Sequence, residues 1–332
     1  MAYWLLICCA MIAVIVVLGG VTRLTHSGLS IVQWKPVSGI LPPLSEAEWE
    51  ETFRLYQQFP EYQKLNRDMT LAGFKSIFWL EYIHRLWGRL IGLVFLLPFL
   101  YFLMKGLISE SLLPKFIAMF LLGGSQGVLG WFMVKSGLVD RPDVSQYRLT
   151  AHLGLAFLIY GYIFWTAMGL LHPRAHSPDM PFLRRSAKAL TALIVITVLS
   201  GGFVAGLDAG FAYNTFPLMG DRFIPEGMLL LDPPYRNLFE NLTTVQFDHR
   251  ILAMLTLLGT TLLWGYSLVV SLPVRTRTAL HGLFAGTVLQ VVLGISTLLW
   301  VVPVPLAAAH QAGALILMTA ALWAVFELRG AS

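Results

Sequence analysis

The segment FWLEYIHRLWGRLIGLVFLLPFLYFLM (78–104) decides the fold, because it is long and apolar enough to cross a bilayer and carries a histidine near its start. Three more apolar runs open on a histidine: HLGLAFLIYGYIFWTAMGLL (152–171), HRILAMLTLLGTTLLWGY (249–266) and HQAGALILMTAALWAVF (310–326). Imidazole is rare inside membrane spans and usually functional there. The first candidate site residues are therefore His84, His152, His249 and His310.

The composition excludes an ordinary soluble domain. Hydrophobic residues make up 57% of the chain and charged residues 12%, against about 25% charged in soluble domains. A membrane span needs about 20 apolar residues. Eight runs qualify, which predicts an all-α integral membrane protein; they lie at 3–20, 78–104, 115–134, 150–171, 188–207, 247–270, 278–301 and 306–327.

The charge of the short loops predicts the topology. Lysine and arginine gather in alternate short loops and at the end of the chain, at Lys105, Lys115, Arg174, Arg184, Arg185, Lys188, Arg275, Arg277 and Arg329. Cytoplasmic loops carry this excess, so we expect both termini to be cytoplasmic and the long loops 21–77 and 208–246 to be outside. The first run lacks a basic signal-peptide segment and no transit peptide precedes it, which favours a retained helix in a bacterial inner membrane.

The two halves of the chain repeat each other. His84-Arg85 matches His249-Arg250, and SQGVLG (125–130) matches LQVVLG (289–294). The repeat predicts two duplicated four-helix bundles, residues 1–171 and 188–332, joined by a cytoplasmic linker at 172–187. With the predicted topology, all four histidines lie toward the outer face.

This placement predicts two pairs, His84 with His152 and His249 with His310. Facing imidazoles between helices can hold a haem iron axially. The neighbouring Arg85 and Arg250 are suited to haem propionates, because guanidinium binds carboxylates in bidentate fashion. A single such histidine could instead be an interhelical hydrogen-bond residue, but four in register favour ligation.

The halves differ at one position beside the histidines. Glu81 stands three residues before His84, whereas Gln246 stands three residues before His249. A carboxylate on the face of the ligand can move protons during an oxidation, which an amide cannot. The alternative is a structural ion pair between Glu81 and Arg85.

The remaining candidates have simpler interpretations. The adjacent Cys8 and Cys9 are expected to pack as small apolar residues. The pairs Gly88/Gly92 and Gly123/Gly127 have the spacing of close helix packing. The other four histidines form no pair: His172 and His176 are expected to be solvated, and His26 and His281 stand alone.

The stretches GGVTRLTHSGLSIVQWKPVSGILPP (19–43) and FKSIFWLEYIHRLWGR (74–89) closely resemble the haem A synthase family, the Cox15/CtaA proteins. The resemblance covers essentially the whole chain. It implies oxidation of the C8 methyl group of haem O to a formyl group, which gives the haem A of cytochrome c oxidase. It also implies a haem b cofactor on His249 and His310, and a haem O substrate site at His84 and His152 with Glu81 catalytic.

The chain lacks the cysteine pairs that many Gram-positive members carry in the outer loops, and it is similar to the proteobacterial and mitochondrial branch. The matching outer-loop segment 44–66 contains a Ser45/Glu48 capping box and is predicted to be an amphipathic surface helix. It could also cover the substrate site.

Two other functions are compatible with paired histidines: a di-haem b membrane electron carrier, and a haem-transfer or oxidase-assembly protein. The expected partners are haem O synthase, cytochrome oxidase assembly factors and an electron-transfer protein. A homo-oligomer is compatible with the sequence, and no feature indicates binding to nucleic acid.

Overall fold

The structure is a computed structural model that describes residues 1–33, 38–139, 142–173 and 180–329. Over these ranges the only β pairing is an isolated bridge between Met219 and Arg222. Eight helices are long and apolar enough to cross a membrane, which confirms the predicted fold class. They are α1 (Ala2–Leu24), α4 (Leu71–Met104), α5 (Leu113–Gly137), α6 (Gln146–Leu171), α7 (Pro181–Gly206), α9 (Leu242–Val269), α10 (Val274–Leu299) and α11 (Val304–Glu327).

Two of these helices begin earlier than their apolar runs. Helix α4 starts after Thr70, whose hydroxyl accepts a hydrogen bond from the Gly73 N–H at 3.3 Å. Helix α9 starts after Asn241, whose side-chain oxygen accepts from the Thr244 N–H at 2.9 Å. These N-caps satisfy backbone donors of the first turn, so each helix extends into polar sequence.

The chain forms two compact units. The N-terminal unit comprises residues Ala10–Ile159, and the C-terminal unit comprises Met1–Cys9 together with the chain from Tyr160 onward. Helices α1 and α6 each contribute to both. The boundaries drawn from the repeat, 1–171, 172–187 and 188–332, stay a prediction.

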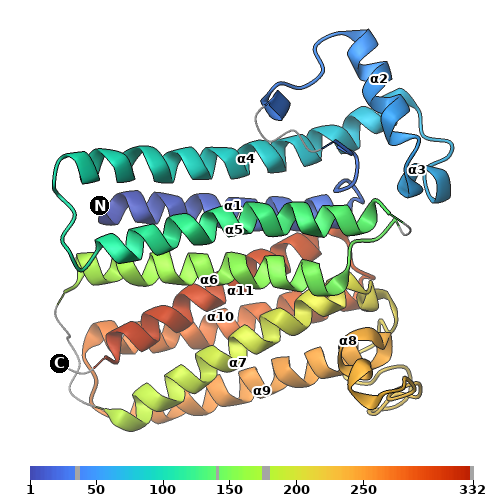
Figure 1. Ribbon diagram of the computed structural model, residues 1–332. Coiled ribbons are helices and arrows are strands. Elements are labelled where there is room, and N and C mark those ends of the chain that lie inside the picture. The colour runs from blue at the N-terminus through green and yellow to red at the C-terminus, as the bar shows by residue number, and fades with distance from the viewer. Residues whose placement is uncertain (34–37, 140–141, 174–179, 330–332) are drawn as a thin grey trace. The chain divides into compact units, whose positions relative to one another are not determined.

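In the N-terminal unit, α4 and α5 run side by side, and a helical segment packs on the start of α4 (Figure 1). The short helix η1 (Ser38–Ile40) precedes this segment, which is made of α2 (Glu46–Tyr56) and α3 (Pro60–Lys64). The capping box is present, with hydrogen bonds of 3.3 Å in both directions between Ser45 and Glu48.

The apolar face of α2 is covered by α4. Trp49 and Tyr56 are buried against Phe74 and Phe78, and the Trp49 and Phe78 rings meet edge-on with centroids 4.8 Å apart. The segment is therefore anchored by an aromatic cluster to the helix that carries His84.

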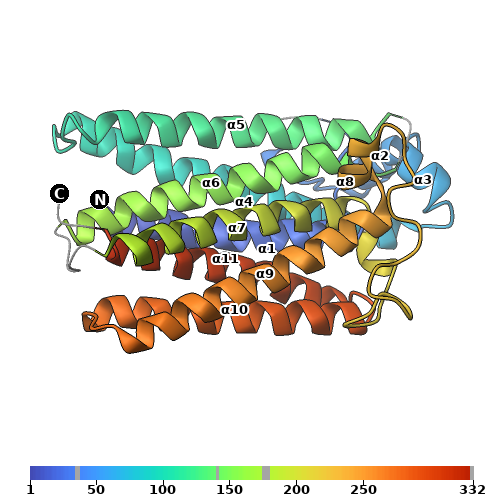
Figure 2. The same cartoon turned by 90° about the horizontal axis from the view of Figure 1, so that it is seen from below.

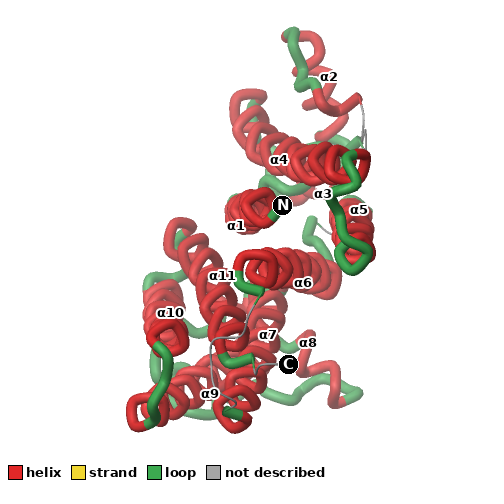
Figure 3. Tube along the Cα trace, turned by 90° about the vertical axis from the view of Figure 1, so that its left-hand side faces the viewer, coloured by secondary structure: helices red, strands yellow, loops and turns green. Residues whose placement is uncertain are grey.

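In the C-terminal unit, α7, α9, α10 and α11 pack together (Figure 3). Helix α9 lies beside α10 (Figure 2). The loop between α7 and α9 contains η2 (Ala209–Phe211), η3 (Pro234–Arg236) and α8 (Asn237–Glu240). The fully buried Asn237 holds this loop through hydrogen bonds to both backbone groups of Leu231, at 2.9 and 2.8 Å.

Two histidines of this unit have partners that the sequence did not predict. His172 was expected to be solvated, but its Nδ1 lies 3.2 Å from Nη1 of Arg275. Nη2 of the same arginine pairs with the buried Glu327 at 2.9 Å. His281 accepts a hydrogen bond from the Trp264 indole at 2.7 Å. His176 lies outside the described residues.

Candidate functional site

The C-terminal unit brings His249 of α9 and His310 of α11 together. Their ring centroids are 6.5 Å apart and their planes are perpendicular. Two metal–imidazole bonds of about 2 Å each, extended to the ring centres, span about 6 Å. The separation therefore fits one metal atom between the rings. The described residues contain no cluster of three or more His, Cys, Asp or Glu that could hold a metal ion, so any metal here would have two protein ligands.

The N-terminal unit brings His84 of α4 toward His152 of α6, close enough for the two imidazoles to interact electrostatically. Nδ1 of each ring is buried and makes no hydrogen bond with the described residues. Buried polar atoms without partners are costly, so an orphaned ring nitrogen favours a site that a ligand completes. His249 and His310 are thus neighbours in the C-terminal unit, and pairing of His84 with His152, which lie in the same unit, stays a prediction.

Each of the four imidazoles lies directly against a glycine of another helix. A Cβ atom placed at Gly19 would lie 2.9 Å from Cε1 of His84, and one at Gly130 would lie 2.9 Å from Cε1 of His152. In the C-terminal unit the corresponding distances are 3.2 Å from Gly201 to His249 and 2.8 Å from Gly294 to His310. Any larger residue would displace the ring, so these glycines fix the imidazole positions.

Two glutamines hold the backbone of the second histidine in each pair. Gln126 Nε2 donates to the backbone carbonyl of His152 at 3.0 Å, and Gln290 Nε2 donates to that of His310 at 3.0 Å. Gln126 and Gln290 occupy matching places in the repeated segments SQGVLG and LQVVLG. The repeat therefore preserves the support of the histidines as well as the histidines themselves.

Glu81 and Arg85 fasten the loop after α1 onto α4. The buried Glu81 carboxylate accepts from the Ser30 hydroxyl and from the Ile31 N–H, both at 2.7 Å. Its other oxygen pairs with Arg85 Nη2 at 2.5 Å, and Arg85 also donates to the Ile31 carbonyl at 3.0 Å. The structural ion pair considered from the sequence is thus present, as part of a larger latch.

Gln246 and Arg250 form the equivalent latch in the C-terminal unit. Gln246 Nε2 donates to the Tyr213 carbonyl at 3.0 Å. Arg250 donates to the same carbonyl at 2.9 Å and to the Thr215 carbonyl at 2.8 Å. Glu81 thus accepts hydrogen bonds from its loop, whereas Gln246 donates one to its loop, so a carboxylate could not replace the amide in the C-terminal latch.

Comparison with known proteins gives the family. The model of the COX15-CtaA family, described as cytochrome oxidase assembly protein, matches residues 2–322. This chain belongs to the COX15-CtaA family. Its eight apolar helices make it a multi-pass membrane protein, and the resemblance stated from the sequence is confirmed.

Similar members of the family span nearly the whole chain. Heme A synthase of Nitrosospira multiformis is 56% identical over 331 residues, which cover 99% of this chain and 93% of that protein. Heme A synthase of Nitrosomonas eutropha is 52% identical, with coverage of 98% and 93%. Heme A synthase COX15 of Homo sapiens is 51% identical over 335 residues, with coverage of 98% and 82%.

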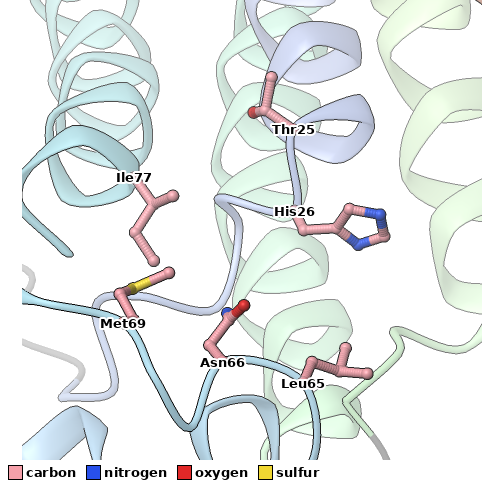
Figure 4. Close-up of a pocket in the computed structure, with 6 residues that line it drawn as sticks. All are labelled: Thr25, His26, Leu65, Asn66, Met69 and Ile77. Atoms are coloured by element: carbon pink, nitrogen blue, oxygen red, sulfur yellow. The ribbon is translucent and has the colours of Figure 1, made fainter. Parts of the chain in front are cut away.

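A cavity of about 390 Å³ lies in the N-terminal unit beside the latch. It is lined by Thr25, His26, Leu65, Asn66, Met69 and Ile77, from the end of α1, the loop before α4 and α4 itself (Figure 4). Ile77 precedes Glu81 by one helical turn. Among the described residues, His26 is a histidine that lines this cavity.

Within the described part of the chain, most glycines with small-residue spacing do not touch another helix. A Cβ at Gly88 would meet Ile15 at 3.4 Å, but one at Gly92, Gly123 or Gly127 would have no neighbour within 4 Å among the described residues. Close packing predicted from the small-residue spacing is therefore wrong at those three positions. The four glycines beside the histidines do touch a neighbour at the site, and their repeated position in each half was the available signal.

Proposed function

We propose that this chain is a haem A synthase, a membrane enzyme that oxidises the C8 methyl group of haem O to a formyl group to give haem A for cytochrome oxidase. The observation that carries the proposal is the duplicated pair of histidines, each ring set against a glycine. Relatives named Heme A synthase, at 50% identity or more and matching nearly the whole chain, support it. Two successive oxidations of the methyl carbon, each adding one hydroxyl from water and passing two electrons to the proposed electron-transfer partner with release of two protons, would give a geminal diol, which loses water to the aldehyde.

In the proposal, His249 and His310 hold a haem b cofactor. The 6.5 Å separation of their rings and the chemistry of two imidazole donors fit an iron that both residues would hold. When bound, haem b would supply one-electron redox chemistry. His84 and His152 would bind the substrate haem O, because Glu81 stands three residues before His84, where the other half has Gln246 before His249.

Arg85 and Arg250 are proposed to bind the haem carboxylates. Arg250 Nε is buried and makes no hydrogen bond with the described residues, so this arginine keeps a donor for an anionic ligand. The arginines also fasten the loops above the two histidine pairs. They would therefore couple binding of a carboxylate to closure of these loops against water.

Glu81 is proposed as the acid–base residue of the oxidation, because it precedes the substrate ligand His84 by one helical turn on the same face. Oxidation of a methyl group releases protons, and a carboxylate held by Ser30 and Ile31 is positioned without freedom to turn away. The latch role and the catalytic role can coexist, and the experiment below separates them.

We further propose a bacterial inner membrane location with cytoplasmic termini, in which both histidine pairs lie toward the outer side. The supporting observation is the concentration of lysine and arginine in alternate short loops. The proposed partners are haem O synthase, oxidase assembly factors and an electron-transfer protein.

Extraction of the pigments from the purified protein tests the function. Haem b together with haem O, haem A or hydroxylated intermediates is the expected result in chromatography and mass spectrometry. Haem b alone at two equivalents would indicate a di-haem electron carrier. Unmodified haem O that is bound but never converted on supply of an electron acceptor would indicate a haem-transfer protein.

Comparison of the single variants Glu81→Gln and Ser30→Ala distinguishes a catalytic role of Glu81 from its role in the loop latch. Both variants weaken the loop latch, but only Glu81→Gln removes the acid. If Glu81 is catalytic, its variant should lose about 10²–10⁴-fold in haem A formation. Ser30→Ala should lose about one hydrogen bond, roughly 1 kcal/mol. Equal losses in both variants would assign Glu81 to the latch alone.

A further inference from the structure

One hydrogen bond distinguishes His249 from the other three histidines. Nδ1 of His249 lies 2.8 Å from the Ser200 hydroxyl on α7. Nδ1 of His84, His152 and His310 is buried without a hydrogen bond to the described residues. The difference lies within otherwise repeated surroundings, so it is specific to one ligand of one site.

The direction of this hydrogen bond follows from the protons available. The Ser200 hydroxyl has one proton, and it donates that proton to the Thr197 carbonyl at 2.8 Å. Toward His249, the same oxygen can therefore act only as an acceptor. With the hydroxyl proton on the Thr197 carbonyl, Nδ1 of His249 carries the proton of this hydrogen bond, which leaves the lone pair on Nε2, the nitrogen that can bind a metal.

The corresponding place in the N-terminal unit has no hydroxyl. Ser200 directly precedes Gly201, the glycine against His249, and Leu18 directly precedes Gly19, the glycine against His84. A leucine side chain cannot accept a hydrogen bond, so Leu18 cannot give Nδ1 of His84 the partner that Ser200 gives Nδ1 of His249. A permanent cofactor gains from a fixed ligand, whereas a substrate must enter and leave.

We infer that Ser200 is a positioning residue that fixes the tautomer of His249 and tunes the haem at the C-terminal site. The inference rests on the proposed function in one respect, that His249 and His310 hold haem b. A hydrogen bond from Nδ1 makes the imidazole a stronger donor, which favours Fe(III) over Fe(II) and lowers the reduction potential. It also strengthens retention of the haem.

The test is Ser200→Ala in the full-length purified protein, measured by redox titration of the haem b spectrum and by the rate of haem transfer to an apo-globin acceptor. Loss of a supporting hydrogen bond typically weakens a metal site by about 10–100-fold. If binding of Fe(III) haem becomes tenfold weaker and binding of Fe(II) haem does not change, the reduction potential of the haem rises by about 59 mV. Haem release should accelerate by at least a similar factor.

Three variants control the experiment. Ser200→Thr keeps a hydroxyl that can bond the backbone one turn earlier and should behave as the wild type. Ser200→Cys keeps the size but is a poor acceptor, so it should shift the potential in the same direction as Ser200→Ala. Thr191→Val removes a hydroxyl of the same helix that bonds only the Ala187 carbonyl, at 2.8 Å, and should change neither quantity.

The outcomes distinguish a failure of the proposed function from a failure of the role of Ser200. A wild-type protein without low-spin haem at His249 and His310 contradicts the proposed function. A wild-type protein with that haem, and Ser200→Ala and Ser200→Cys variants with unchanged potential and release rate, contradicts the role of Ser200 while leaving the proposed function intact. A shift of similar size in Thr191→Val would attribute the effect to helix packing and also overturn the inference.

Discussion

Substitution of Gly294 by alanine should empty the proposed haem b site without unfolding the protein. The added Cβ would lie 2.8 Å from Cε1 of His310, 3.4 Å from Nδ1 and 3.5 Å from Nε2. Ordinary carbon contacts are about 3.5–4.0 Å, so the imidazole must retreat by roughly 1 Å. His249 stands on another helix and would keep the iron in its place. The displaced His310 ring would therefore lose its bond to the iron.

The expected loss can be separated from any change in stability. Alanine in a helix is favoured over glycine by about 1 kcal/mol, so the backbone itself should gain from the change. Misplacement of a reacting group by about 1 Å can lower a reaction rate about 10²-fold. The affinity of a haem iron for a displaced imidazole should be comparably sensitive. We therefore expect haem b occupancy to fall by at least tenfold in Gly294→Ala, measured as haem per protein after purification.

Gly286→Ala is the matched control on the same helix. A Cβ there would meet Leu317 at 3.7–3.8 Å, an ordinary contact, and no histidine. This variant should purify with normal haem content. Equal haem contents in Gly294→Ala and Gly286→Ala, each with a low-spin spectrum, would refute the reasoning that a glycine contact positions His310.

Three further results are expected. Gly130→Ala should lower haem A formation at least tenfold but keep haem b. Gly127→Ala, whose added Cβ has no neighbour within 4 Å among the described residues, should leave both haem A formation and haem b content unchanged. Burial raises the pKa of Glu61 from 4.5 to about 7, so the folded state binds this proton more tightly than the unfolded state. The stability that this proton contributes is complete below pH 4.5 and is lost as the pH rises through about 7. The melting temperature of Glu61→Gln should lack this pH dependence. Because Cys8 and Cys9 are buried, a membrane-impermeant thiol reagent added outside should label Glu50→Cys and Asp221→Cys but not Arg185→Cys, and the reverse pattern would invert the proposed topology.

The sequence by itself determined the eight helices, the four histidines and the family. A bilayer has no water to satisfy backbone groups, so an apolar run of about 20 residues can only be a helix. The histidines stand out for the same reason, because a polar ring is costly in such a run. Helix starts were harder to predict, since α4 begins in polar sequence under the control of the Thr70 cap.

The tertiary structure alone decided what supports each histidine. Ser200 and His249 are 49 positions apart, and Ser30 and Glu81 are 51 apart, so no local pattern links them. Spacing identified glycines in general but could not tell Gly294, which touches an imidazole, from Gly127, which touches nothing within 4 Å. The physical reason is that helical periodicity fixes which residues share a face, whereas the neighbour of that face depends on how helices distant in sequence pack together.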